Sequence, residues 1–175
     1  RSGAQQNDLV CITGNLGAAY MGLQLLEREK RVLADVENPE PQFKGYEYLL
    51  EKYLKPRPRT DIVRALAEEK IRPTSMIDLS DGLASDIRHI MERSGVGAAI
   101  DIGRIPLAQG ADDETATCGG EDYKLLLTAD TAAADRLAAD FRARFGTPLH
   151  PVGRITGSGK LEWLENGRPR ALDWH

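Results

Sequence analysis

The stretch SMIDLSDGLASDIRHI, residues 75–90, changes its structural period partway along. Its first part, Ser75 to Leu79, has the β-branched and apolar residues typical of a strand. From Gly82 to Ser94 the apolar residues recur at the spacing of an amphipathic helix. Three aspartates lie around the changeover. The stretch therefore predicts a strand that leads directly into a helix, with carboxylates where the chain leaves the sheet.

The rest of the chain also alternates between strand and helix patterns, without a repeat or a low-complexity segment. Asn166-Gly167 predicts a hairpin between residues 161 and 174. Such a mixture predicts an α/β (α+β) layered sandwich, in which helices flank a mixed sheet. The further strands are expected at Leu9–Gly14, Gly97–Ile105, Tyr123–Thr128 and His150–Ile155, and the further helices at Leu16–Lys30, Tyr46–Tyr53, Asp61–Ile71 and Thr131–Phe145.

Composition excludes several classes of protein. The 175 residues are 41% hydrophobic and 29% charged, which is typical of a folded globular domain and not of a disordered chain. A net charge of -4 argues against non-specific nucleic-acid binding. No apolar run has membrane-spanning length, and no signal peptide is visible. Cys11 and Cys118 form no metal-ligand pattern, so we expect buried free thiols in the reducing cytoplasm.

The acidic turn between strand and helix predicts a metal–phosphate site. Asp78 and Ser80 are two residues apart and share a face in an extended chain, and Asp81 follows at the helix start. Ser and Asp are also ordinary helix caps, so this simpler interpretation stays open. A helix N-terminus attracts anions, but two carboxylates would repel a phosphate unless Mg²⁺ lay between them. We therefore predict Asp78 and Asp81 as Mg²⁺ ligands, and Asp86 as a solvated or capping carboxylate.

A second acidic cluster is CGGEDY, residues 118–123. Its two glycines allow close approach of the backbone to a ligand, or positive φ angles. Two acids follow, and then a strand. Taken alone, this cluster is equally compatible with an ordinary tight turn that exposes its acids.

The two clusters together resemble the thiamine-monophosphate kinase family, which belongs to the aminoimidazole ribonucleotide synthetase-like superfamily. IDLSDGLASDIRHI, IDIGRIPL and GGEDYKLLLT follow one another at the family's order and spacing. RSGAQQNDLVCITGNLGAAYMGLQLL is similar to the family's upstream stretch, and ALDW to its close. The resemblance implies that residues 1–175 are the C-terminal αβ domain of a kinase whose N-terminal domain is absent from this chain. Residues 36–58 then form a variable insertion and linker.

The resemblance implies ATP- and Mg²⁺-dependent phosphorylation of thiamine monophosphate to thiamine diphosphate. By motif, Asp78 and Asp81 match metal ligands, Ser80 and Arg1 match residues that contact ATP, and Glu121 matches a residue that contacts the substrate. No residue of the chain is assigned as a catalytic acid or base. The family's missing domain supplies further ligands and the homodimer core, so we expect this chain alone to be inactive.

Several residues depart from the family pattern. Ala18 stands where the family commonly has Asp, and Asn7 replaces a common Gly. The segment from Pro106 to Cys118 is also shorter than usual. The chain stops just after Trp174, before the family's terminal aromatic segment, and we do not assign Trp174 a role in substrate binding.

Parts of the sequence are also compatible with different functions. LVCITG followed by Gly17, Gly22 and a helix could belong to a dinucleotide-binding enzyme, with Asp35 at the end of a second strand as the ribose-binding acid. However, the glycines do not follow the G-x-G-x-x-G pattern. A superfamily member that acts on a different phosphorylated substrate would share both acidic clusters, and a non-enzymatic binding module could retain the fold. We expect His89, on the helix of residues 82–94, to be a packed or capped residue.

Overall fold

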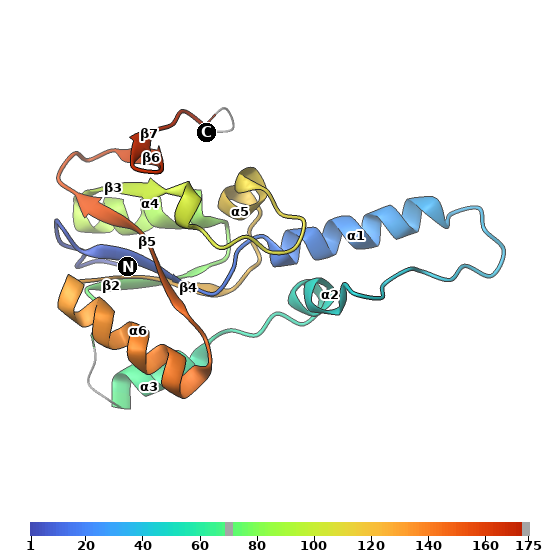
Figure 1. Ribbon diagram of the computed structural model, residues 1–175, viewed down its shortest axis with the longest axis horizontal. Coiled ribbons are helices and arrows are strands. Elements are labelled where there is room, and N and C mark those ends of the chain that lie inside the picture. Colours follow the sequence, from blue (N-terminus) through green and yellow to red (C-terminus); the bar gives the residue numbers. More distant parts are fainter. Residues whose placement is uncertain (69–71, 173–175) are drawn as a thin grey trace.

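The computed structural model describes residues 1–68 and 72–172 of the protein, and these residues contain one mixed sheet (Figure 1). The strand order is β2-β4-β1-β5-β3-β6-β7. Neighbouring strands run antiparallel, except that β3 and β6 are parallel. The strands are β1 (Leu9–Thr13), β2 (Ser75–Leu79), β3 (Gly97–Asp101), β4 (Lys124–Ala129), β5 (Leu149–Thr156), β6 (Leu161–Glu165) and β7 (Arg168–Pro169).

Helices cover both faces of the sheet, which confirms the predicted layered sandwich. On one face, Leu83, Ile87 and Ile90 of α4 pack in a cluster with the inward side chains of β1 and β2. On the other face, α3 and α6 bury Ile62 and Phe141 against β4 (Figure 1). The helices are α1 (Ala18–Val32), α2 (Glu47–Leu54), α3 (Thr60–Glu68), α4 (Leu83–Ser94), α5 (Asp113–Cys118) and α6 (Thr131–Phe145), with a 3₁₀ turn η1 (Ile102–Arg104).

The pattern of apolar and polar residues in each strand follows from how deeply the strand is buried. Every residue of β4 is buried, so its run KLLLTA is nearly continuous in apolar residues instead of alternating with polar ones. Leu126 points into the cluster under α4, while Leu125 and Leu127 point into the cluster under α3 and α6. β2 lies at the edge of the sheet and is buried only at alternate positions, which leaves Asp78 exposed.

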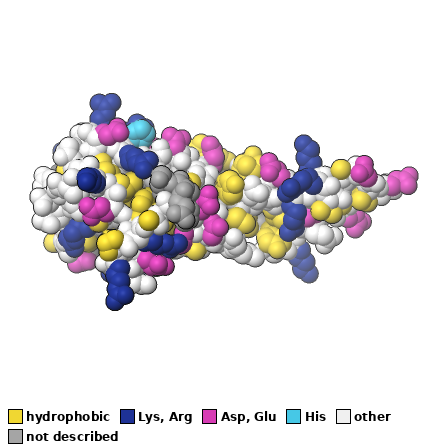
Figure 2. Space-filling model, turned by 90° about the horizontal axis from the view of Figure 1, so that it is seen from above, with side chains coloured by type: hydrophobic (Ala, Val, Ile, Leu, Met, Phe, Trp, Pro, Cys, Tyr) yellow, Lys and Arg dark blue, Asp and Glu magenta, His cyan; other side chains and the backbone are white. Residues whose placement is uncertain are grey.

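Helices α1 and α2 form an arm that projects from the sheet (Figure 1). Figure 2 shows this arm as a narrow extension with charged side chains of both signs and hydrophobic side chains between them. The carboxylate of Glu29 accepts a hydrogen bond from the Gln42 backbone N–H (2.9 Å) and pairs with Arg28. These contacts hold the segment that follows α1 against the helix.

A close contact joins the two helices of the arm at Gly22. A Cβ atom at Gly22 would lie 2.3 Å from the backbone oxygen of Leu49, a residue of α2 that is itself buried. Glycine in a helix interior is unfavourable relative to alanine by about 1 kcal/mol. Here it allows the backbones of two helices to approach.

Most predicted elements are confirmed, with four differences. The strand expected to reach Ile105 ends at Asp101, whose side chain accepts a hydrogen bond from the Gly103 N–H and starts the turn η1. No element was predicted at α5, whose short helix is capped by Asp112. The strand considered near Asp35 is wrong, because turns follow α1 there. The helix expected at Asp61–Ile71 begins at Thr60, and its last residues, 69–71, lie outside the described residues.

The predicted hairpin is confirmed: β6 pairs with β7, and Asn166 and Gly167 both have positive φ (52° and 77°), as the favoured two-residue turn requires. Trp174 lies outside the described residues. Within residues 1–68 and 72–172, no helix combines the length and the apolar character needed to cross a membrane.

Gly22→Ala should destabilise the protein although the same change usually stabilises a helix. The added methyl group meets the Leu49 carbonyl, so we expect α2 to separate from α1 and the free energy of unfolding to fall by about 1–3 kcal/mol. Thermal unfolding and hydrogen exchange of the α2 amides measure both effects. Glu27→Ala, on the exposed surface of the same helix, is the control and should change little. Equal stability of the Gly22 variant and wild type would contradict this account.

Candidate active site

The two acidic turns predicted from the sequence lie side by side at one end of β2 and β4. The ladder between these strands pairs Leu79 with Lys124. Beyond it, the Tyr123 N–H donates to the Leu79 oxygen (2.9 Å) and the Glu121 N–H donates to the Ser80 oxygen (2.8 Å). The backbone of the second turn is therefore bound directly to the backbone of the first.

Two glycines make this contact possible. Gly82 has φ 104° and ψ 153°, a conformation that is essentially restricted to glycine, and a Cβ there would lie 2.9 Å from the Thr117 oxygen. A Cβ at Gly120 would lie 2.9 Å from the Ser80 oxygen. In the same turn Glu121 and Tyr123 have positive φ, 60° and 47°, which is uncommon for such residues. The strained backbone shows that this turn is held by its surroundings.

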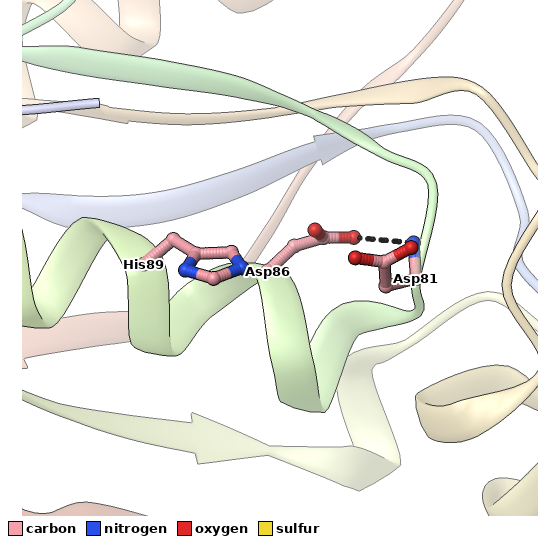
Figure 3. A group of neighbouring side chains, drawn as sticks. All are labelled: Asp81, Asp86 and His89. Carbon is pink, nitrogen blue, oxygen red and sulfur yellow. Dashed lines mark hydrogen bonds between the residues drawn. The ribbon is translucent and has the colours of Figure 1, made fainter.

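Asp86 is the buried carboxylate that supports the first turn. It is 1% exposed, and its Oδ2 accepts hydrogen bonds from the backbone N–H groups of Ser80 (3.0 Å) and Asp81 (3.1 Å). Figure 3 shows the bond from Asp81. Burial, opposed by these hydrogen bonds, raises the pKa of Asp86. The expectation of a solvated side chain is wrong. The expectation of a capping carboxylate is confirmed, because Asp86 binds the amides that precede α4.

Asp81 lies beside Asp86 and His89 (Figure 3). Each of the three side chains offers one potential ligand atom, and these atoms lie within 4.8 Å of one another. Asp81 is exposed and His89 is half-buried on α4. One carboxylate oxygen of Asp86 is already bound to the turn, which leaves the exposed Asp81 as the most available ligand.

Asp78 does not belong to this group. It lines a cavity of about 310 Å³ on the α3 side of β2, together with Arg59, Tyr123 and apolar side chains. No hydrogen bond or ion pair engages the carboxylate of Asp78 or Asp81 within the part of the chain that the structure describes. Free, exposed carboxylate oxygens are the ligands that Mg²⁺ prefers, so both residues fit the metal predicted for them.

The structure places the remaining predicted site residues as follows. Ser80 lies between Asp78 and Asp81, and Glu121 lies on the neighbouring turn with its side chain exposed. The Glu121 carboxylate interacts with the Tyr123 hydroxyl and raises the pKa of that tyrosine. Arg1 is not brought to this group, because it lines a different cavity at the start of β2, near Ser75.

Asp122 is a structural residue that the sequence analysis left without a role. Its Oδ2 accepts a hydrogen bond from the Gly17 N–H (2.7 Å) and its Oδ1 accepts one from the Ala19 N–H (3.3 Å), so it caps α1 from another part of the chain. The donors at this helix N-terminus are thus used internally. In addition, β1 is antiparallel to both of its neighbours, unlike the first strand of a dinucleotide-binding fold. Both observations argue against a dinucleotide-binding enzyme.

Lys124 is a second residue that sequence reasoning missed. It is 9% exposed, and its side chain crosses Gly14, where a Cβ would lie 3.5 Å from the Lys124 Nζ. Burial, together with the like charges of Lys52 and Arg59, lowers the pKa of Lys124 to about 8, while Asp122 acts in the opposite direction. The only signal in the sequence was a cation at the start of an apolar strand, which gives no indication of burial.

Comparisons with known proteins identify a family that this chain resembles along most of its length. Residues 6–164 match the protein family described as AIR synthase related protein, C-terminal domain. Thiamine-monophosphate kinase from Escherichia coli strain K12 is 35% identical over 184 residues, covering 99% of this chain and 53% of that protein.

Two solved structures are similar as well. The thiamine-monophosphate kinase from Stenotrophomonas maltophilia K279a superposes with a TM-score of 0.77 at 28% identity, covering 97% of this chain and 53% of that one. AaThiL complexed with AMPPCP and TMP superposes with a TM-score of 0.71 at 26% identity, covering 96% and 52%. The chain spans about half the length of the curated relatives it matches.

Gly82→Ala should destabilise the protein more than Gly159→Ala. Both glycines have positive φ, but only at Gly82 would the new methyl group meet backbone atoms, while the space around Gly159 is open. We expect a loss of about 1–2 kcal/mol at Gly159 from the unfavourable φ alone, and roughly twice that loss at Gly82. Urea unfolding of the two variants measures the difference. Equal losses of stability in the two variants would show that the turn at Gly82 is not in close contact with residues 117 and 118.

Lys124→Met should stabilise the protein at neutral pH. In the folded state the pKa of Lys124 is about 8, against an ordinary value of 10.5, so folding below pH 8 forces an unfavourable charge into a buried position. Between these values the unfolded chain holds a proton that the folded chain has released. The wild type therefore gains stability as the pH rises, and its deficit relative to the variant shrinks. Urea unfolding across this range tests the prediction, and parallel profiles would contradict it.

Proposed function

This chain belongs to the AIR synthase related protein family, whose C-terminal domain it matches, and from that premise we propose that it is the C-terminal half of an ATP- and Mg²⁺-dependent kinase. The proposed reaction transfers the terminal phosphoryl group of ATP to thiamine monophosphate, and the products are thiamine diphosphate and ADP. The E. coli relative bears the name of this activity, and the AaThiL structure contains AMPPCP and TMP.

One observation carries the proposal: the free carboxylates of Asp78 and Asp81 and the exposed carboxylate of Glu121 lie on two turns that are bound to each other at one edge of the sheet. A phosphate that accepts a phosphoryl group from ATP must approach a chain of like charges. At about 4 Å, and with an effective dielectric constant of about 20, each pair of unit charges repels by about 4 kcal/mol. A site for this reaction therefore needs divalent cations, and it needs carboxylates to hold them.

In this proposal Asp78 and Asp81 hold Mg²⁺. Asp81 lies with Asp86 and His89, whereas Asp78 lines the cavity on the other side of β2, so we assign the two residues to different ions. When bound, the ions neutralise the phosphate charges that meet during transfer. Asp86 contributes indirectly, because it binds the turn amides and thereby positions Asp81.

The remaining assignments concern the two substrates. Ser80 contacts ATP, and Glu121 contacts thiamine monophosphate, whose thiazolium ring carries a positive charge that a carboxylate attracts. Arg1, the other residue matched to an ATP contact, lines a different cavity at the start of β2, so in this proposal it contacts a part of the nucleotide distant from Ser80. The rest of the site, and the homodimer interface, lie in an N-terminal domain outside this chain, so the chain alone does not turn over substrate. Residues 36–58, which follow α1 and include α2, are a variable insertion and linker. We place the reaction in the cytoplasm.

Asp78→Asn and Asp81→Asn in the complete protein should each lower kcat by at least about 100-fold, because an amide does not replace a carboxylate as a ligand for a hard cation. A coupled assay for ADP, with thiamine monophosphate as the acceptor, measures the rate. Raising the Mg²⁺ concentration should partly restore both variants. Because both side chains are exposed and free, their thermal stability should match the wild type.

Asp35→Asn is the matched control. Asp35 is also an exposed aspartate, but it lies in the arm, where a dinucleotide-binding enzyme would place its ribose-binding acid. We expect full kinase activity from this variant. Full activity of Asp78→Asn and Asp81→Asn would refute the metal-ligand assignment. If the protein phosphorylates another phosphorylated acceptor but not thiamine monophosphate, it is a superfamily member with a different substrate.

A further inference from the structure

Lys124 is a buried cation without a bound partner. Only 9% of the residue is exposed, and within residues 1–68 and 72–172 no hydrogen bond or ion pair joins its ammonium group to another residue. An ammonium group has three N–H donors, and leaving them unused in a protein interior is costly. This residue therefore differs from the surface lysines of the chain, whose ammonium groups water satisfies.

The Lys124 ammonium group is not fully shielded from solvent. Every described nitrogen or oxygen of a side chain that is fully shielded from solvent has a hydrogen-bond partner. Because Lys124 Nζ has none, it retains contact with solvent although the rest of the side chain is buried. The aliphatic stem crosses Gly14, where the absence of a side chain leaves room for it. The lysine is thus held along a defined path with its charge at the open end.

The surroundings of Lys124 are positively charged on two sides. Lys52 of α2 and Arg59, in the segment between α2 and α3, both act on Lys124 electrostatically as like charges. Arg59 is partly neutralised by Asp61 (2.9 Å), whereas Lys52 contacts the ring of Tyr48 (5.4 Å from its centroid) and has no carboxylate partner among the described residues. Asp122 is the opposite charge that acts on Lys124, but its carboxylate is engaged by the amides of Gly17 and Ala19. The like charges of Lys124 and Lys52 therefore favour an anion between them.

A purely structural role for Lys124 as the partner of Asp122 is less satisfactory. Asp122 already accepts hydrogen bonds from the N-terminal amides of α1, and no ion pair within 4 Å joins it to Lys124. The lysine also has an unfavourable effect on stability, because burial opposes its charge. A residue that destabilises the fold and has free donors is typical of a binding site.

We propose that Lys124, with Lys52 beside it, forms a subsite for a phosphoryl group of a substrate. The inference rests on the proposed kinase function for the identity of the substrate. Lys124 lies three residues after Glu121 and is paired across the sheet with Leu79, so this subsite adjoins the two acidic turns. The carboxylates of those turns hold cations, and the lysines hold a phosphate directly. Charges of both signs would then bring the two phosphate-bearing substrates together.

The test uses the complete protein with Lys124→Met, which keeps the length and the apolar stem of the side chain but removes its charge. Inorganic phosphate is titrated by calorimetry in the presence of EDTA, so that metal-mediated binding does not contribute. We expect at least a tenfold weaker affinity for phosphate, with a melting temperature equal to or above that of the wild type.

Lys52→Met should weaken binding less, because Lys52 is less buried than Lys124. Lys160→Met, an exposed lysine on the distant β5–β6 turn, is the control and should bind phosphate normally.

Steady-state kinetics identify the source of the phosphoryl group. A raised KM for thiamine monophosphate with an unchanged KM for ATP assigns the subsite to the acceptor, and the opposite pattern assigns it to the nucleotide. Unchanged phosphate affinity and unchanged KM values for both substrates in Lys124→Met would overturn the subsite. A melting temperature below that of the wild type would overturn it as well, because Lys124 would then be a structural residue. If the wild type shows no kinase activity but Lys124→Met still loses phosphate binding, the proposed function fails and the subsite stands.

Discussion

The candidate active site depends on a few backbone hydrogen bonds made beyond the ends of two strands. The N–H groups of Tyr123 and Glu121 bind the oxygens of Leu79 and Ser80, and they extend the contact between β2 and β4 into the turns that follow. Side chains at Gly82 or Gly120 would prevent this approach. The two turns continue directly from β2 and β4, and every residue of β4 is buried. The carboxylates on the turns are therefore positioned by a strand in the interior of the sheet.

The acids in these turns have different roles, which burial separates. Asp86 and Asp122 have their carboxylates engaged by backbone amides, one at the turn before α4 and the other at the start of α1. Asp78, Asp81 and Glu121 are exposed, and the first two have no partner among the described residues. The buried pair stabilises the backbone, and the exposed group remains available for ligands.

Negative and positive side chains occupy different parts of the site. Exposed carboxylates gather on the two turns, whereas Lys124 and Lys52 lie where the turn after β1 meets α2. α2 belongs to the arm, so the contact between Gly22 and Leu49 that holds the arm together also sets the position of Lys52. A segment that resembles a variable insertion thus contributes a charge next to the site.

The sequence alone determined the elements and the identity of the motifs. Hydrophobic periodicity predicted β2 and α6 with their observed bounds, and Asn166-Gly167 predicted the hairpin, because these signals are local. The pairing of SDGL with GGEDY identifies the family, and the same motifs predict Asp78 and Asp81 as metal ligands. Short elements such as α5 were missed, because few residues carry their signal.

Tertiary structure decided which acids are free and which are engaged. Asp122 binds the amides of Gly17 and Ala19, which lie 105 and 103 residues earlier, and such a contact cannot be inferred from spacing in the sequence. The separation of Asp81 from Asp78 and the displacement of Arg1 to another cavity have the same origin. Lys124 is the clearest case: its burial depends on Gly14, 110 positions earlier by residue number, so its lowered pKa arises only when the sheet brings the two together.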